Sequence, residues 1–248
     1  MWGSAFPLVK VALSEVSPVT LGFLRFMLAT PVLVLYAYLK DGKGFRALFY
    51  KDLDSLILMG LTGVMGYQVF QNIGVGYTSA TNSSIIISSN PIVLTLLSIP
   101  LLKEKVSATR ALGMAIGFSG VLTIILSGSQ GLSPGSSSLL GDELSFMGGL
   151  SWAIYSLVSR RRGAAGNPIG LTAASTAFGT LFLILPMFIL ENPRLPTTIT
   201  VWAIVVILGL GASCLAYTLW NKVLSEEEAS KAGISLFLSV GILARASS

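Results

Sequence analysis

The sequence has 248 residues, of which 53% are hydrophobic and 11% are charged, with a net charge of +5 and a mean hydropathy of +0.79. Soluble domains carry about 25% charged residues, so this composition excludes a water-soluble globule and indicates a polytopic membrane protein. The chain has no histidine and a single cysteine, Cys214, which excludes an intramolecular disulfide and makes a metal site improbable. We therefore expect neither a metal nor a cofactor.

Nine apolar segments follow one another along the chain, and each is a candidate for a helix across about 30 Å of hydrocarbon. We expect them at Trp2 to Leu13, Pro18 to Leu39, Leu53 to Tyr77, Ala80 to Leu102, Ala108 to Leu126, Leu144 to Ser159, Ile169 to Leu190, Ile199 to Asn221 and Ala229 to Ala244. The first segment is short for a span, so we expect the chain to begin inside its first helix.

The segments fall into two units that resemble each other. A slide of 149 or 150 residues superposes Gly60 on Gly209, Asn72 on Asn221, Trp2 on Trp152 and Pro18 on Pro168. We expect a first five-helix unit over residues 1–128 and a second over 141–248 that lacks its last helix. Because each unit has an odd number of spans, the second unit should have the opposite orientation in the membrane. The predicted fold is thus all-α, an inverted repeat with about nine spans.

Lysine and arginine are concentrated in alternate connections between the segments. These residues are Lys40, Lys43, Arg46 and Lys51, then Lys103, Lys105 and Arg110, then Arg160, Arg161 and Arg162. The intervening connections hold a single arginine, in ENPRLP. The positive-inside rule therefore predicts a multi-pass protein of the cell membrane with its N-terminus in the cytoplasm. Topology explains the basic residues, and nucleic acid is not an expected partner.

Four stretches carry a family resemblance. They are WGSAF in the first segment, LGFLRFMLA around Arg25, TSATNSSIIISSNPI in the fourth segment, and KEKVSATRALGMAIGFSGV leading into the fifth. Together they resemble the EamA-like branch of the drug/metabolite transporter superfamily. The resemblance implies ten spans in two inverted five-helix repeats. It is weaker in the second half, where Ser239, Val240 and Gly241 stand in place of the usual Asn or Ile followed by Pro.

A polar stripe marks the third segment. Gln68, Gln71 and Asn72 lie on one helical face by their i, i+3, i+4 spacing, and the 149-residue slide pairs them with Tyr217, Trp220 and Asn221. A polar side chain in hydrocarbon costs free energy unless it has a partner, so such a stripe faces another helix or a wet cavity. Hydrogen bonding between helices and substrate binding both stay open as interpretations.

Other candidate substrate-binding residues are scattered over the two units. Asn90 precedes Pro91, whose ring kinks the helix and frees a carbonyl. Arg25 lies deep in the second segment, where it could bind a substrate carboxylate or bond loose carbonyls. Trp2, Trp152 and Tyr155 belong to equivalent segments and either line the cavity or pack in the core. The small-residue seam at Gly113, Gly117 and Gly120 predicts close helix contact, within the chain or in a homodimer.

Three functions of different classes are compatible with these features. The leading hypothesis is a secondary transporter of a small organic solute, such as an amino acid or a drug, that works by alternating access and resembles exporters. The second is an inactive remnant or half-partner of such a transporter. An intramembrane enzyme is the least favoured, because a serine nucleophile needs a base and Lys10 is the sole substitute for the absent histidine. We expect no catalytic residues.

Overall fold

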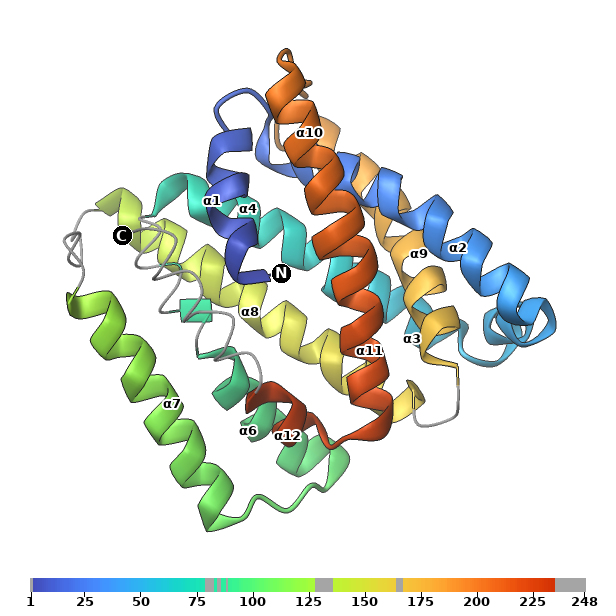
Figure 1. The fold of residues 1–248 in the computed structure, drawn as a ribbon, viewed down its shortest axis with the longest axis vertical. Coiled ribbons are helices and arrows are strands. Elements are labelled where there is room, and N and C mark those ends of the chain that lie inside the picture. Colours follow the sequence, from blue (N-terminus) through green and yellow to red (C-terminus); the bar gives the residue numbers. More distant parts are fainter. Residues whose placement is uncertain are drawn as a thin grey trace.

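The apolar segments of the sequence form helices that lie side by side (Figure 1). The computed structural model describes residues 2–78, 83, 86–87, 89–127, 136–163 and 167–234, and within these ranges it contains no strand. In chain order the elements are α1 Trp2–Ala12, α2 Pro18–Lys51, α3 Leu53–Met59, the π-helical η1 Gly60–Gly66, α4 Tyr67–Tyr77, α6 Asn90–Leu102, α7 Ala108–Ser127, α8 Ser136–Gly163, α9 Pro168–Ile189, α10 Ile199–Ile207, the π-helical η2 Leu208–Leu215, α11 Ala216–Glu226 and α12 Ala229–Ile234.

Four helical stretches are long and apolar enough to cross a membrane: Pro18–Lys51, Leu53–Tyr77, Pro168–Ile189 and Ile199–Glu226. Large apolar side chains on these helices are exposed, among them Leu39 at 74%, Leu185 at 67% and Ile199 at 83%. Water would not stabilise such a surface, whereas lipid would. The all-α, polytopic membrane fold expected from the sequence is therefore confirmed.

The helix bounds differ most from the expected spans at the end of the second and the start of the sixth, while the eighth continues to Glu226, beyond the expected Asn221. The second span, expected to end at Leu39, continues as α2 to Lys51 after a break at Asp41, whose backbone is non-helical at φ −155° and ψ 75°. Asp41 Oδ1 accepts a hydrogen bond from Gly44 N at 2.9 Å and so caps the stretch that follows. The sixth span, expected from Leu144, begins earlier, at Ser136.

Two expected spans are described only in part. The fourth is described at Ser83, at residues 86–87 and from Ser89 onward through α6, and the ninth as α12. The polar residues Asn82, Ser84 and Ser88 and the Ser239 to Gly241 stretch lie outside the described residues.

Equivalent helices of the two units run antiparallel. The N-terminus of α2 lies against the C-terminal end of α9, where the Glu191 carboxylate accepts hydrogen bonds from Val19 N at 3.0 Å and Thr20 N at 2.7 Å. The third and eighth spans share a further feature, since each contains a π-helical segment at the same place, η1 and η2. This is the arrangement that an inverted repeat requires.

Glycines let each π-helical segment approach the other unit closely. A Cβ atom on Gly60 of η1 would lie 2.8 Å from Gly179 N on α9, and one on Gly209 of η2 would lie 3.0 Å from Arg25 O on α2. At such distances even a methyl group would force the neighbouring backbones to shift. Each unit thus packs its π-helical segment onto the second helix of the other unit.

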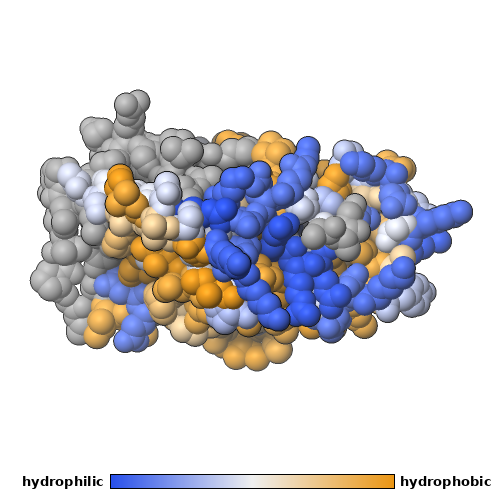
Figure 2. Space-filling model, turned by 90° about the horizontal axis from the view of Figure 1, so that it is seen from below, coloured by the Kyte–Doolittle hydropathy of each residue, from blue (hydrophilic) through white to orange (hydrophobic). Residues whose placement is uncertain are grey.

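The basic connections gather at one end of the molecule. Arg162 forms an ion pair with Asp52, and Arg110 forms one with Glu228. Arg160 donates a hydrogen bond to Leu224 O. These contacts tie together the α2–α3 junction, the end of α8, the start of α7 and the α11–α12 connection. Figure 2 views this end, where hydrophilic side chains spread among apolar ones. The alternation of basic loops seen in the sequence therefore corresponds to a real separation in space.

Candidate substrate-binding site

A small cavity lies between α1, α2, α4 and α11, and side chains from both units line it. Its volume is about 40 Å³, and its lining residues are Ala5, Val9, Arg25, Tyr67, Gln68, Gln71, Asn72, Val75 and Tyr217. A cavity needs on the order of 10–15 Å³ of such volume for each water molecule that it holds. This cavity therefore has room for about three waters and not for an organic solute.

Arg25 is the cation in the wall of this cavity. It lies on α2, its side chain is 6% exposed, and its Nη1 atom donates to Gln68 Oε1 at a long 3.4 Å. Its Nε atom has no hydrogen-bond partner in the described part of the chain, and none of the ion pairs formed there involves it. A charge in the membrane interior costs about 2.5–3.5 kcal/mol on insertion scales, so an arginine held this way is a functional candidate.

The polar stripe of α4 forms one side of the cavity and uses only some of its hydrogen-bonding groups. Gln68 Oε1 accepts from Asn72 Nδ2 at 3.1 Å, and Asn72 Nδ2 also donates to Pro18 O at 3.0 Å. Gln71 Nε2 donates to Ser83 Oγ at 3.2 Å. Among the described residues, Gln68 Nε2 and Gln71 Oε1 have no partner. The stripe therefore bonds neighbouring helices and leaves one amide group of each glutamine without a partner among the described residues.

An aromatic cluster adjoins the cavity. The Trp152 ring on α8 lies 5.3 Å from the Tyr67 ring, 5.1 Å from those of Tyr155 and Tyr217, and 5.9 Å from that of Trp220, between centroids. Tyr67 and Tyr217 belong to both the cluster and the cavity wall. Tyr217 is fixed there by its hydroxyl, which donates to Gly63 O of η1 at 2.7 Å. The cluster gives the cavity a rigid, amphipathic wall.

A sequence model of one transporter family matches almost all of the chain, at residues 1–126 and 139–245. The chain belongs to the EamA-like transporter family. The resemblance seen in the sequence is thus confirmed.

Relatives of this EamA-like chain include transporters from bacteria and archaea. It is 29% identical to the uncharacterised transporter YyaM of Bacillus subtilis over 96% of this chain and 78% of that protein. It is 30% identical to an uncharacterised transporter of Archaeoglobus fulgidus over 95% of this chain and 80% of the relative. It is 27% identical to a probable terminal-alkyne amino-acid exporter of Streptantibioticus cattleyicolor over 96% of this chain and 77% of that exporter.

A solved crystal structure shares the fold of this EamA-like chain. The two superpose with a TM-score of 0.82 at 18% sequence identity, over 98% of this chain and 82% of the other. At this identity the likeness concerns the fold alone.

Five of the eleven sequence-predicted site residues line the cavity: Arg25, Gln68, Gln71, Asn72 and Tyr217. Trp152, Tyr155 and Trp220 stand behind it in the aromatic cluster. Asn90 packs against α8, where a Cβ atom on Gly149 would lie 2.2 Å from its Oδ1. The side chain of Trp2 is not among those that the structure describes. From α1, Ala5 and Val9 line the cavity.

Asn221 is equivalent to Asn72 by the repeat but sits in a hydrogen-bond network of its own. Its Nδ2 atom donates to Tyr155 Oη and Thr172 Oγ1, both at 2.6 Å, and its Oδ1 accepts from Ser159 Oγ at 2.6 Å. The side chain is fully buried. With every hydrogen-bonding atom of its amide engaged, Asn221 joins α8, α9 and α11.

Sequence reasoning missed Tyr67 and Val75 as lining residues. Both continue the stripe at helical spacing, since Tyr67 precedes Gln71 by four residues and Val75 follows it by four. Extending the stripe by one turn in each direction would have found them. Within the described residues, no group of three or more His, Cys, Asp or Glu side chains is placed to hold a metal ion.

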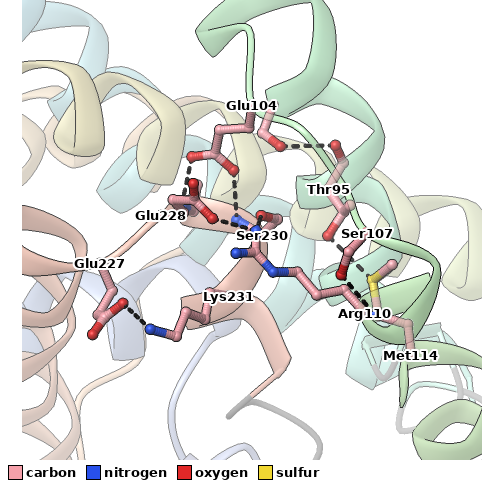
Figure 3. A network of polar contacts seen from close by, with 11 residues as sticks. Thr95, Glu104, Ser107, Arg110, Met114, Glu227, Glu228, Ser230 and Lys231 are labelled. Carbon is pink, nitrogen blue, oxygen red and sulfur yellow. Dashed lines mark hydrogen bonds and ion pairs between the residues drawn. The ribbon is translucent and has the colours of Figure 1, made fainter. Parts of the chain in front are cut away.

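At the basic end, Glu104 links the two units (Figure 3). From the α6–α7 connection its carboxylate accepts from Ala229 N at 2.7 Å and Ser230 N at 3.0 Å, at the start of α12. Burial works to raise the pKa of this carboxyl, but the hydrogen bonds from Ser230 and Ala229 outweigh it and the pKa is lowered. Arg110 adds an ion pair with Glu228 and a hydrogen bond to Ser230 Oγ at 3.3 Å.

At the opposite end, Glu15 links the units in a similar way. From the α1–α2 connection its carboxylate accepts four hydrogen bonds from the backbone and hydroxyl groups of Thr197 and Thr198, at 2.7–2.9 Å, before α10. These bonds, those from Thr198 above all, lower the pKa of Glu15 to about 2. Glu191 caps α2 beside it. Contacts between units therefore hold both ends of the molecule.

Proposed function

We propose that this chain is a secondary transporter that moves a small organic solute across the cell membrane by alternating access. In this proposal the units over residues 1–128 and 141–248 rock against each other, and the N-terminus lies in the cytoplasm. The observation that carries the proposal is the cavity, because Arg25, Gln68 and Gln71 come from the first unit and Tyr217 from the second. A site shared by two inverted units is the arrangement that alternating access uses.

The size of the cavity supports a cycle with closed and open states. At about 40 Å³ it excludes an organic solute in this conformation. Binding therefore requires the units to separate at one end. The contacts of Glu15 at one end and of Glu104 and Arg162 at the other are the ones that would break in turn.

The lining favours an amphipathic solute such as an amino acid or a small drug-like molecule. Two tyrosines provide apolar surface and the amides provide hydrogen bonds, which is the mixture that small-molecule sites use. The relative from Streptantibioticus cattleyicolor is named as an amino-acid exporter. We infer that export is the physiological direction of this transporter as well.

Flux measurements in proteoliposomes test this function. Purified protein is reconstituted and assayed with each of the proteinogenic amino acids in radiolabelled form. Gln71→Ala is expected to lower the flux about tenfold, because losing a hydrogen bond and leaving its partner unpaired costs on the order of 1.4 kcal/mol. Thr62→Ala is the control, since among the described residues the side chain of Thr62 bonds only to Leu58 O of its own turn, at 2.7 Å. Absence of flux for every amino acid, or equal flux in Gln71→Ala, would contradict the proposal.

A further inference from the structure

The cavity wall has an excess of hydrogen-bond donors. Among the described residues, Arg25 Nε and Gln68 Nε2 are buried donors without a partner. The orientation of the Gln68 amide is fixed, because its Oε1 accepts from Arg25 Nη1 and from Asn72 Nδ2. Turning the amide over would set three donors against one another. Each of these two N–H groups can therefore donate a hydrogen bond to an acceptor atom of a bound solute.

The orientation of the Gln71 amide, which would supply a free acceptor atom, is less well determined. Gln71 Oε1 has no partner among the described residues, but its Nε2 faces the Ser83 hydroxyl, which can either donate or accept. Both orientations of the Gln71 amide satisfy that contact. The preference of the site therefore rests on Arg25 and Gln68.

The charge of the wall is also unbalanced. Among the described residues that line the cavity, Arg25 is the one charged side chain, and there is no aspartate or glutamate. A guanidinium does not lose its proton inside proteins. A buried charge is stabilised by a partner of opposite sign, and here no residue of the described chain supplies one. A ligand with a single negative charge would balance this guanidinium.

From these donors and this charge we infer that the transported solute carries a carboxylate, bound by Arg25 and Gln68. A carboxylate is planar, has one negative charge and accepts several hydrogen bonds, which suits one guanidinium and one amide. A phosphate dianion would leave a second negative charge uncompensated. Tyr67 and Tyr217 would then cover the apolar part of the solute. This inference rests on the proposed transport function and specifies its substrate class.

A pair of probes that differ only in charge tests the inference. Full-length protein in nanodiscs is titrated with 3-phenylpropanoate and with 3-phenylpropanamide, and binding is followed by tryptophan fluorescence, since Trp152 contacts both cavity tyrosines. The carboxylate is expected to bind at least about tenfold more tightly than the amide, as charge-assisted hydrogen bonds are about twice as strong as neutral ones.

Three variants complete the test. Arg25→Gln is expected to abolish the preference for the carboxylate, whereas Arg194→Gln, which removes an exposed cation after α9, is expected to keep it. Gln68→Glu places a carboxylate next to Arg25 with almost no change in shape, and it is expected to abolish the preference while supporting the fold. If Arg25→Gln does not fold, Gln68→Glu tests the carboxylate preference on its own.

The outcomes separate the inference from the proposed function. Equal binding of the two probes, no binding of either at millimolar concentration, or an unchanged preference in Gln68→Glu overturns the inference. Flux of a neutral solute that is unaffected by Arg25→Gln also overturns it but leaves the transporter in place. Carboxylate-selective binding without flux of any solute supports the carboxylate site and overturns the transport function.

Discussion

The hydroxyl groups of Thr30 and Thr180 lie 2.9 Å apart, although 150 residues separate the two threonines in the chain. The same 150-residue slide superposes Pro18 on Pro168, so Thr30 on α2 and Thr180 on α9 are equivalent positions of the two units. Two equivalent atoms can meet only near an axis that exchanges the units. Because α2 and α9 run antiparallel, this pair marks the centre around which the units are inverted.

A cysteine pair at these positions is expected to cross-link. In a Cys214→Ser background, Thr30→Cys with Thr180→Cys should form an intramolecular disulfide on mild oxidation, because the two side chains are in contact. The pair Thr30→Cys with Ser175→Cys is the control, since Ser175 lies more than one helical turn from Thr180. A shift in mobility on a non-reducing denaturing gel reports the bond. A stronger cross-link in the control pair would show that the register of α2 and α9 differs.

Glycines at the π-helical segments are expected to be sensitive to substitution. Gly60→Ala should lower the free energy of unfolding by about 1–3 kcal/mol, the usual cost of overpacking, because its Cβ would lie 2.8 Å from a backbone nitrogen of α9. Gly76→Ala, in the same span, meets nothing within 4 Å and should be neutral or stabilising. Thermal unfolding in detergent compares the two. Equal midpoints for both variants would refute the close contact.

Much of the fold could be predicted from the sequence because the membrane leaves few alternatives. The run from Leu53 to Tyr77 was predicted with its observed ends, since both flanks change to polar or turn-forming residues. The continuation of α2 to Lys51 was missed because its charges resemble those of a loop. The π-helical segments were missed because an extra residue per turn leaves no pattern in an apolar stretch, although both segments are rich in glycine.

The candidate site was predictable only along single helices. Helical periodicity grouped Gln68, Gln71 and Asn72 and, through the repeat, pointed to Tyr217. It could not show that Asn221, the equivalent of Asn72, bonds three neighbouring side chains instead of facing the cavity. That difference depends on which residues the adjacent helices contribute, such as Thr172 and Ser159. Spacing within one helix carries no such information.

Asn221 is expected to stabilise the folded protein and not to bind the substrate. Asn221→Ala removes three buried hydrogen bonds and should lower the free energy of unfolding by about 1–3 kcal/mol, because Tyr155, Thr172 and Ser159 lose their shared partner. Lys222→Ala, at the exposed neighbouring position, should change it by less than about 0.5 kcal/mol. Chemical unfolding in mild detergent measures both. An Asn221→Ala protein of unchanged stability and reduced flux would place this residue in substrate binding.

The Arg162 contact at the basic end is expected to be modest and dependent on salt. Its guanidinium pairs with Asp52 at 2.8 Å and bonds Ser55 Oγ at 3.0 Å, and the two charged side chains are 36% and 18% exposed. Arg162→Gln should therefore cost about 0.2–1 kcal/mol at low ionic strength and less in high salt. Arg161→Gln removes an exposed neighbouring charge as the control. A midpoint difference for Arg162→Gln that does not change with salt would speak against the ion pair.

The Glu15 contact at the other end is expected to weaken in acid. The pKa of Glu15 in the folded protein is about 2, below its ordinary value of 4.5, because Thr198 and Thr197 donate hydrogen bonds to the ionised carboxylate. A carboxyl whose pKa is lowered by folding stabilises the folded state fully above pH 4.5, and this contribution is lost as the pH falls toward 2. Wild type should therefore exceed Glu15→Gln in melting temperature at pH 6, and the difference should shrink between pH 4.5 and 2. Glu226→Gln, at an exposed residue that ends α11, controls for the loss of one negative charge. A difference between wild type and Glu15→Gln that stays constant over this range, or that grows in acid, would mean that ionised Glu15 does not hold α10 against the first unit.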